Sequence, residues 1–376
     1  MTELAFLFLK LGMTAFGGPA AHIAMMEDEV VHRKKWMTHE HFLDLLGATN
    51  LIPGPNSTEM AIHIGLLRGG WKGLILAGVC FIGPAVVITL LLAHVYVAYG
   101  RLPRFQPLIE GVRPAILAVI FAAVFRLSRP IIRKPFMVGT GLMAMVLNLM
   151  GLNEIFLLIL SGTTGLLWNS RGKFWPSGLN ALALCAAAPW TMVLTSPTAR
   201  DTATLMALGL FFLKIGSVLY GSGYVLVAFL EGGLVETRHW LTQAQLLDAV
   251  AVGQFTPGPV LSAATFIGYV ILGIPGALTA TAGIFLPSFI FVLIISRFIP
   301  RLRNSSSTAG FLDGVNAASI GLMLAVTMVL AGSTLTEPLT WGLFGLAVYT
   351  VLVWNLNAGW IVGGSALAGW LIGNYL

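Results

Sequence analysis

The sequence predicts an all-α integral membrane protein in which one helical unit occurs twice. Of its 376 residues, 57% are hydrophobic and only 10% are charged, and the mean hydropathy is +0.88. Soluble domains carry about 25% charged residues, so one water-soluble core could not bury a chain this apolar. Apolar runs of about 20 residues, the length that spans a bilayer, recur along it. The 43 glycines and 18 prolines interrupt these runs, as in membrane helices that bend or stop inside the bilayer.

Composition also excludes several classes of function. The net charge of +6 comes from basic residues in short loops between apolar runs. No Lys/Arg stripe with interleaved aromatic residues occurs, so no nucleic-acid partner is expected. Cys80 and Cys185 lie in apolar runs, and the pair His39 and His41 reads as a wet interfacial turn. We therefore expect no disulfide, no metal and no other cofactor. Zinc-protease and serine-hydrolase motifs are missing, which argues against an enzyme.

An internal duplication sets the domain organisation. Residues 8–55 align without a gap with residues 212–259. The chain therefore divides into an N-terminal transporter-like repeat (1–170), a connecting transmembrane segment (171–203) and a C-terminal repeat (204–376). Matched pairs are Lys10 and Lys214, Gly17 and Gly221, Glu27 and Glu231, Trp36 and Trp240, Asp44 and Asp248, and Pro53–Pro55 and Pro257–Pro259.

Each repeat is predicted to begin with two short helical hairpins, followed by full spans. A hairpin arm of about 12 residues is near 18 Å long, too short for a bilayer core of about 30 Å. In the first repeat we expect arms at 4–16, 19–31, 39–51 and 56–67, then spans near 72–99, 107–126, 135–150 and 154–169, with a further span near 177–195 in the connecting segment. In the second we expect hairpins at 205–235 and 243–270, then spans near 275–297, 311–331, 340–354 and 360–375.

The basic residues indicate how the repeats are oriented. With an odd number of spans between the two sets of hairpins, the second set opens on the opposite face. The positive-inside rule then predicts an inverted repeat with a cytoplasmic N-terminus and an external C-terminus. If the hairpins cross the whole membrane, several loops lie on the other side of it. The cytoplasmic set is Arg33, Lys34, Lys35, Arg68, Lys72, Arg126, Arg129, Arg133, Lys134, Arg171, Lys173, Arg297, Arg301 and Arg303; the external set is Arg101, Arg104, Arg200 and Arg238.

Four Gly- and Pro-rich breaks predict an anion site. A helix interrupted in the bilayer leaves backbone groups without partners, which is tolerated where they line a cavity. Proline suits the first turn of a new half-helix, whose free N–H groups and partial positive charge favour anions. Four such ends would suit a tetrahedral oxyanion; alternatively, the breaks only kink helices. The residues assigned to the site are Gly17, Gly18, Asn50, Pro53, Gly54, Pro55, Asn56, Ser57, Thr58, Gly221, Ser222, Gly223, Gln254, Thr256, Pro257, Gly258 and Pro259.

Charged residues inside apolar runs supply further candidates. Lys10 and Lys214 lie in matching half-helices, where a charge is expensive and usually functional. They are assigned to anion binding, although both could instead extend to the membrane interface. The coupling candidates are Glu27, Glu59, His63, Arg113 and Glu231, with Glu59 favoured because the second repeat lacks a counterpart. For Arg113 a local pair with Glu110 is an equal alternative, and Asp44 and Asp248 are expected to pair with basic groups or cap backbone.

The breaks and their flanks together resemble the chromate ion transporter family, in its two-domain, fused form. The resemblance covers nearly the whole chain. In the second half, Gly-Ser-Gly stands where the first has Gly-Gly-Pro, so the halves need not bind identically. The residues that carry the resemblance are Phe16–Pro19, Glu27, Arg33–Trp36 and Leu51–Pro55, then Gly221–Tyr224, Trp240–Thr242 and Gln254–Pro259.

The residues together predict an inverted-repeat secondary transporter with broken or re-entrant hairpins, and the resemblance adds an expected cargo. It implies chromate export from the cytoplasm across a bacterial-type inner membrane, driven by the membrane potential or a proton gradient. Sulfate is expected to act as a structural analogue. A sulfate or other small-anion importer, or a passive channel of the same architecture, remains open as an alternative, as does a homodimeric assembly.

Overall fold

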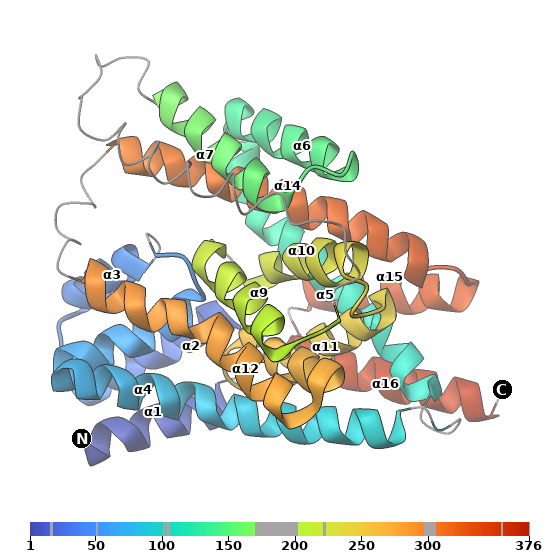
Figure 1. Ribbon diagram of the computed structural model, residues 1–376, viewed down its shortest axis with the longest axis horizontal. Coiled ribbons are helices and arrows are strands. Elements are labelled where there is room, and N and C mark those ends of the chain that lie inside the picture. The colour runs from blue at the N-terminus through green and yellow to red at the C-terminus, as the bar shows by residue number, and fades with distance from the viewer. Residues whose placement is uncertain are drawn as a thin grey trace.

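A computed structural model describes residues 1–15, 18–49, 52–100, 102, 106–169, 202–220, 223–296, 306–354 and 356–375. Every regular element in these ranges is a helix (Figure 1). The first half contains α1 (Thr2–Thr14), α2 (Pro19–Glu27), η1 (Asp28–Arg33), α3 (His39–Thr49), α4 (Asn56–Tyr99), α5 (Gln106–Ile132), α6 (Pro135–Leu149) and α7 (Glu154–Asn169). The second contains α9 (Leu205–Val218), η2 (Gly223–Val225), α10 (Leu226–Leu230), η3 (Glu231–Thr237), α11 (Gln243–Phe255), η4 (Val260–Ser262), α12 (Ala263–Ile295), α14 (Ser306–Thr334), α15 (Pro338–Leu352) and α16 (Ala358–Tyr375).

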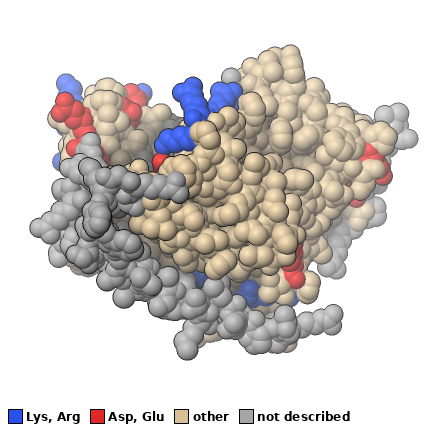
Figure 2. All heavy atoms as spheres, turned by 90° about the horizontal axis from the view of Figure 1, so that it is seen from above, with Lys and Arg blue, Asp and Glu red and all other residues tan. Residues whose placement is uncertain are grey.

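Four helices are long and apolar enough to cross a membrane. They cover Asn56–Tyr99, Gln106–Ile132, Val260–Ile294 and Ala309–Thr334. Large apolar side chains stay exposed on their outer faces, for example Val87 and Leu91 of α4. Figure 2 shows a broad face of the molecule on which charged side chains are few. The architecture is that of an all-α membrane protein, as the composition predicted.

The predicted hairpins are present, and the last helices of each repeat lie close to their predicted bounds, but three of them are too short to be the full spans that were expected. α1 and α3 end before the first two breaks, and new helices begin at Pro19 and Asn56. α6, α7 and α15, expected as full spans, have only 15 or 16 residues. At 1.5 Å per residue this is about 22–24 Å, less than a bilayer core. Between α6 and α7 the chain reverses at Gly151, whose φ of +90° ends the helix early. The predicted span at 177–195 lies outside the described residues.

Both halves repeat the same unusual backbone geometry. Among the residues that the structure describes, Lys35 and His239 are the non-glycine residues with positive φ, at 51° and 53°, and they occupy matched positions before α3 and α11. The long helices α4 and α12 each contain one kink, at Gly70 (φ 59°, ψ −150°) and Gly273 (φ 65°, ψ −153°). The backbone therefore follows the duplication seen in the sequence well beyond the aligned segment.

Equivalent helices of the two halves run antiparallel. At the start of α4, Glu59 accepts a hydrogen bond from Ser288, near the end of α12. At the other end of α4, His94 lies 2.7 Å from the hydroxyl of Tyr269, near the start of α12. A repeat related by an axis in the membrane plane requires this antiparallel pairing, whereas a parallel repeat would not produce it. The inverted orientation of the two repeats stays a prediction, and it requires this antiparallel pairing.

The last two helices of each half pack on the other half. The α6–α7 pair packs against α14, and the α15–α16 pair packs against α5 (Figure 1). Glycines lie where the helices of each crossing come closest. Gly165 of α7 faces Gly314 of α14, and Gly369 of α16 faces Gly111 of α5, so closely that a Cβ on any of them would collide with backbone. Small residues at crossings let membrane helices approach and gain dispersion energy.

The breaks of the two halves are bonded to each other. Gly54 of the first Pro-Gly-Pro run donates its N–H to the Leu219 carbonyl, at 2.6 Å. Gly258 of the second run donates to the Ala15 carbonyl, at 2.9 Å. Each carbonyl belongs to the end of the other half's first helix, so the two bonds are reciprocal. Both glycines have positive φ, 140° and 90°, which favours glycine.

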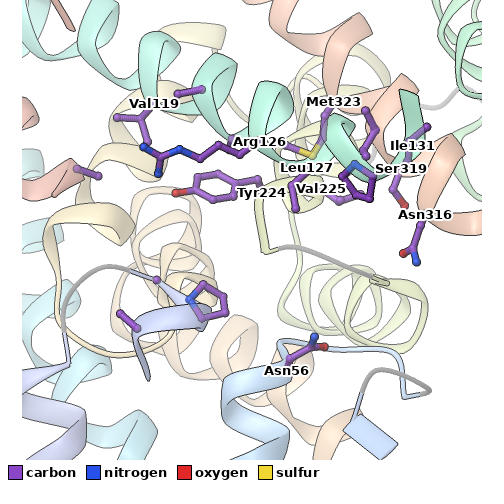
Figure 3. Close-up of a pocket in the computed structure, with 18 of the residues that line it drawn as sticks. Asn56, Val119, Arg126, Leu127, Ile131, Tyr224, Val225, Asn316, Ser319 and Met323 are labelled. Atoms are coloured by element: carbon purple, nitrogen blue, oxygen red, sulfur yellow. The ribbon is translucent and has the colours of Figure 1, made fainter. Parts of the chain in front are cut away.

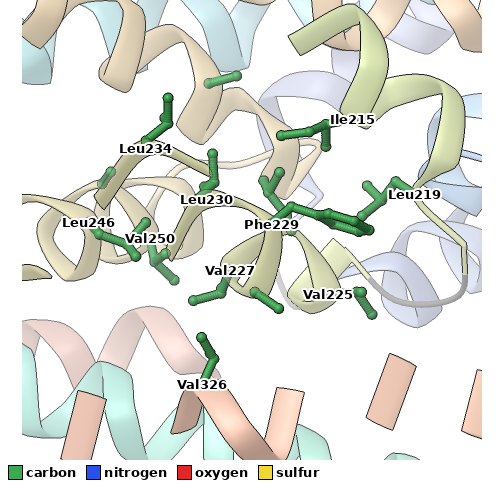
Figure 4. Close-up of a cluster of buried hydrophobic side chains, with 14 of the residues drawn as sticks. Ile215, Leu219, Val225, Val227, Phe229, Leu230, Leu234, Leu246, Val250 and Val326 are labelled. Carbon is green, nitrogen blue, oxygen red and sulfur yellow. The ribbon is translucent and has the colours of Figure 1, made fainter. Parts of the chain in front are cut away.

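The main apolar core lies around the hairpins of the second half. Phe229 and Leu230 of α10 pack with Leu246 of α11 and with Ile215 of α9 (Figure 4). Val326 of α14 closes the cluster from the opposite side (Figure 4). This packing holds the second-half hairpins against the long helices. In the first half, the matching region borders a cavity instead.

Replacing Gly258 tests the crossed bonds. In Gly258→Ala the new Cβ lies in a left-handed conformation and 3.1 Å from the Ala85 Cβ. Such strain costs roughly 1–3 kcal/mol, so the apparent unfolding temperature in detergent should fall. Gly139→Ala is the matched control, because a Cβ there meets no atom within 4 Å. Equal unfolding temperatures for the two variants would contradict a structural role for the Gly258 conformation.

Candidate functional site

A cavity of about 1130 Å³ lies between the first-half hairpins and the helices α5 and α14. Its walls come from both halves of the chain. Figure 3 shows Arg126 and Tyr224 on one side of it, with Asn56 on the facing side. The lining residues used below are Gly18, Pro19, Asn56, Arg126, Lys134, Tyr224, Gln254, Asp313, Asn316 and Ser319.

All four breaks reach this cavity. Gly18 and Pro19 follow the first break, and Asn56 follows the second. Tyr224 follows the third break, and Gln254 directly precedes the fourth. The reciprocal bonds between the breaks explain this convergence, because they fix each Pro-Gly-Pro run beside the end of the other half's first helix.

Arg126 supplies positive charge inside the cavity. It lies near the end of α5, and its Nη2 donates to the Val351 carbonyl at 2.5 Å. The side chain runs beside the Tyr224 ring (Figure 3). A guanidinium presents several N–H donors in a fixed plane, a geometry that suits the oxygens of a carboxylate or another oxyanion. At the cavity rim, Lys134 adds a second cation, paired with Asp313 at 2.9 Å.

Buried polar groups also face the cavity. Tyr224 donates its hydroxyl to Gln254 Oε1 at 3.3 Å. Among the described residues, Gln254 Nε2 and the Ser319 hydroxyl have no hydrogen-bond partner, although both side chains are more than nine-tenths buried. A buried donor without a partner is costly, and a bound acceptor would satisfy it. Both groups are donors for a ligand rich in oxygen acceptors.

Two helices begin at the cavity without a side-chain cap. α2 starts after Gly18, and α4 starts after Pro55. The first N–H groups of a helix have no partner within it, and the helix end carries about half a positive charge. Together with Arg126 and Gln254, these ends make a site that favours a compact anion.

Most of the other residues assigned to the site lie beside the cavity rather than in its lining. Gly54 and Gly258 form the crossed bonds, with their flanking prolines. Ser57 lies 3.3 Å from the buried His22 ring, and Thr58 is fully buried. Thr256 bonds to the Val252 carbonyl, and Gly223 packs against Leu261. Gly17, Asn50, Gly221 and Ser222 lie outside the described residues.

Neither lysine assigned to the site lines the cavity. Lys10 forms a 2.7 Å ion pair with Glu29, and 45% of its side chain is exposed. The position matching Glu29 in the second half is Gly233, and there Lys214 interacts electrostatically with Glu154 instead. Each lysine therefore has a carboxylate nearby that partly neutralises it. The sequence could not show this, because both carboxylates are distant in the chain.

The coupling candidates fall into three environments. Glu59 is fully buried between α4 and α12; among the described residues its Oε2 has no partner, and His63 lies one turn further. Glu27 and Glu231 each bind the start of the next helix, through His39 (2.7 Å) and Gln243 (2.9 Å). Arg113 pairs with Asp248 rather than with Glu110, at 3.2 Å.

A second, smaller cavity of about 490 Å³ lies at the opposite ends of α5 and α14. Its lining includes Glu110, Arg113, Thr334, Glu337 and Thr340. Among the residues that the structure describes, no group of three or more His, Cys, Asp or Glu side chains is placed to hold a metal ion.

Sequence reasoning missed Arg126 and the pairing of Tyr224 with Gln254. Arg126 was placed in a cytoplasmic loop, because the predicted span ended there. The structure continues α5 to Ile132, so Arg126 lies within the helix. A signal was available: the apolar run is followed by Leu127 and then Pro130-Ile131-Ile132, which extends the hydrophobic segment past the arginine.

Comparisons with known proteins agree on one family. The family model described as chromate transporter matches residues 2–166 and again residues 206–370. A chromate transport protein of Cupriavidus metallidurans is 32% identical, over 98% of this chain and 92% of its own length. A chromate transport protein of Pseudomonas aeruginosa is 31% identical, over 97% and 91%. A probable chromate transport protein of Synechococcus elongatus is 30% identical, over 95% and 91%. No solved structure matches the chain.

Thiol labelling would show to which side each cavity opens. In a background with Cys80 and Cys185 replaced by serine, Asn316→Cys in the large cavity should react with an impermeant reagent from one face of the membrane. Thr334→Cys in the small cavity, at the other end of the same helix, should react only from the opposite face. Labelling of both from one face would contradict a spanning α14.

Proposed function

Because the chain belongs to the chromate transporter family, we propose that it is a secondary transporter that carries chromate out of the cytoplasm across a bacterial-type inner membrane. Sulfate, which has the same tetrahedral shape and charge, is the expected competitor. The names of the full-length relatives favour a transport protein over an enzyme.

The observation that carries this proposal is the large cavity and its donors. Chromate and sulfate are strongly hydrated dianions, so burying one requires fixed charge and hydrogen-bond donors to replace its water. Arg126, the Gln254 amide and the Ser319 hydroxyl supply such donors from three different helices. The uncapped starts of α2 and α4 add N–H groups. A tetrahedral oxyanion can accept from all these directions at once.

The charges at the two cavities support the proposed direction of transport. The mouth of the large cavity carries Arg126 and the Lys134–Asp313 pair, whereas the small one is lined by two carboxylates, Glu110 and Glu337, and one cation, Arg113. By the positive-inside rule the basic mouth faces the cytoplasm. Cytoplasmic dianions are thus attracted to the open cavity, and the acidic side chains at the other end disfavour their return.

Alternating access would follow from the inverted repeat. The cavity is open beside the first-half hairpins and closed beside the second-half hairpins. Because the two halves are built alike, exchanging these two arrangements would close the cytoplasmic side and open the external one. Glu59, a buried carboxyl between the halves, is the proposed site for a coupled proton, since intramembrane carboxyls commonly serve proton relays.

The decisive measurement is chromate flux into or out of proteoliposomes that contain the purified protein. Flux that depends on an imposed pH gradient or membrane potential, and that sulfate suppresses, would support a coupled oxyanion carrier. Flux insensitive to any gradient would indicate a passive channel instead. A sulfate flux without chromate flux would favour the sulfate importer.

Arg126→Gln should weaken chromate binding by about 10- to 100-fold, because a charge-assisted hydrogen bond contributes roughly 1.5–3 kcal/mol. The measurement is equilibrium binding of chromate to detergent-solubilised protein. Arg129→Gln is the matched control: it lies one turn further on α5, where its guanidinium stacks on Phe125 outside the cavity lining.

The double variant Lys10→Gln/Lys214→Gln separates the cavity from the site predicted from the sequence. If the cavity holds the anion, this variant should bind chromate far better than Arg126→Gln does. Loss of binding in the lysine variant, with retention in Arg126→Gln, would move the site to the half-helices that carry the lysines.

Glu59→Gln should remove the dependence of chromate flux on the pH gradient, because the amide has the shape of the carboxyl but no titratable proton. Chromate binding should stay within about twofold of wild type. Proteoliposomes with an imposed pH gradient and a clamped membrane potential provide the readout. Ser288→Ala, which removes only the hydrogen-bond donor to Glu59, is the control. A gradient dependence unchanged from wild type would exclude Glu59 as the proton carrier.

A further inference from the structure

The hairpins of the two halves differ in what they pack against. α11 packs against α5 and α16, and α10 packs against α14. Their first-half counterparts, α3 and α2, pack against α4, and the large cavity lies between α2 and the helices α5 and α14. The same elements thus occur once in a closed arrangement and once in an open one.

One cluster of side chains ties the closed arrangement together. The Arg113 guanidinium of α5 meets the Asp248 carboxylate of α11 through two contacts, 3.2 Å from Nε to Oδ1 and 3.3 Å from Nη2 to Oδ2. Tyr96 of α4 donates its hydroxyl to Oδ2 at 2.8 Å. The Asp248 side chain is only 4% exposed. Three helices are therefore joined at one buried carboxylate.

The two cavities are lined at matched positions of the two halves. Glu110, Arg113 and Glu337 line the small cavity. The residues at matched positions in the other half are Asp313, Asn316 and Lys134, and all three line the large cavity. At the large cavity, the neutral Asn316 thus stands at the position that Arg113, with its ion pair, occupies at the small cavity.

We propose that Arg113, Asp248 and Tyr96 form a latch that keeps the small mouth closed, and that Arg113 becomes a ligand of the departing anion when the latch opens. This inference rests on the proposed function of the large cavity. Separating a buried ion pair leaves two uncompensated charges, which typically costs several kcal/mol. A dianion that arrives at Arg113 replaces Asp248 as its partner and offsets this cost. The latch then opens with anion present and stays shut without it.

The chemistry accounts for the sign of each group. An anion can exchange with Asp248 only if the residue that both bind is a cation, and a bidentate guanidinium suits a carboxylate and a tetrahedral oxyanion equally. Tyr96 keeps Asp248 hydrogen-bonded, so the carboxylate is not left bare when Arg113 turns to the anion. Glu110 and Glu337 then favour release over retention.

A reversible cross-link tests whether this mouth must open. Ala244→Cys on α11 and Thr334→Cys on α14 both line the small cavity, and neither belongs to the latch. In a background without other cysteines, a short bifunctional thiol reagent should reduce chromate flux in proteoliposomes at least tenfold, and a reductant should restore it. The control is Phe136→Cys/Trp168→Cys, whose rings stack 4.4 Å apart between α6 and α7. Unchanged flux in the linked Ala244/Thr334 protein would overturn the proposal.

A second measurement needs no chromate flux. Asp248→Asn should raise the rate at which an impermeant reagent labels Thr340→Cys in the small cavity at least fivefold, because the amide cannot hold Arg113 as firmly. The variant Arg113→Gln/Asp248→Asn, which leaves no buried charge unpaired, covers the case in which the single variant does not fold. An unchanged labelling rate in both would overturn the latch. If the labelling rises and no chromate moves, the latch stands and the proposed cargo fails.

Discussion

The structure depends on two backbone hydrogen bonds that cross between the halves. Gly54 and Gly258 each donate to a carbonyl at the end of the other half's first helix. Buried backbone groups in a membrane must find partners within the protein, and a broken helix offers several that have none. By satisfying each other, the breaks bring four helix ends to the protein interior. Only a residue tolerant of positive φ can stand at these two positions, so glycine between two prolines follows from the geometry.

This arrangement puts the proposed anion site where the two halves meet, because the breaks belong to both. Neutral N–H dipoles alone would leave a dianion poorly compensated, and Arg126 adds a full charge within the same cavity. The charge comes from a long helix rather than from a half-helix. The half-helices contribute N–H dipoles, while α5 contributes the cation. A movement of the hairpins against α5 therefore changes the distance between the two.

Local chemistry explains which parts could be predicted. The breaks, the hairpins and the duplication follow from proline and glycine, whose effects act within a few residues. The anion preference of the broken helices stays a prediction, and the cation that lines the cavity beside them was not foreseen. Lys10 looked isolated in sequence, yet Glu29 pairs with it 19 residues away. Arg126 looked like a loop residue because hydropathy alone ended α5 too early. Partners distant in the chain, and the exchange of helix pairs between halves, become visible only in three dimensions.

The departures from symmetry are as informative as the symmetry. An inverted repeat with identical halves would favour its two end states equally. Here Arg113 and Asp248 join helices at the small cavity, whereas Asn316 stands at the position of Arg113 at the large cavity. The main apolar core also surrounds the second-half hairpins, so closure at the small cavity buries more apolar surface than closure at the large cavity would. Both differences stabilise the state that is open at the basic mouth. The export that we propose would need this resting preference, since such a carrier waits with its cavity open to the side from which it loads.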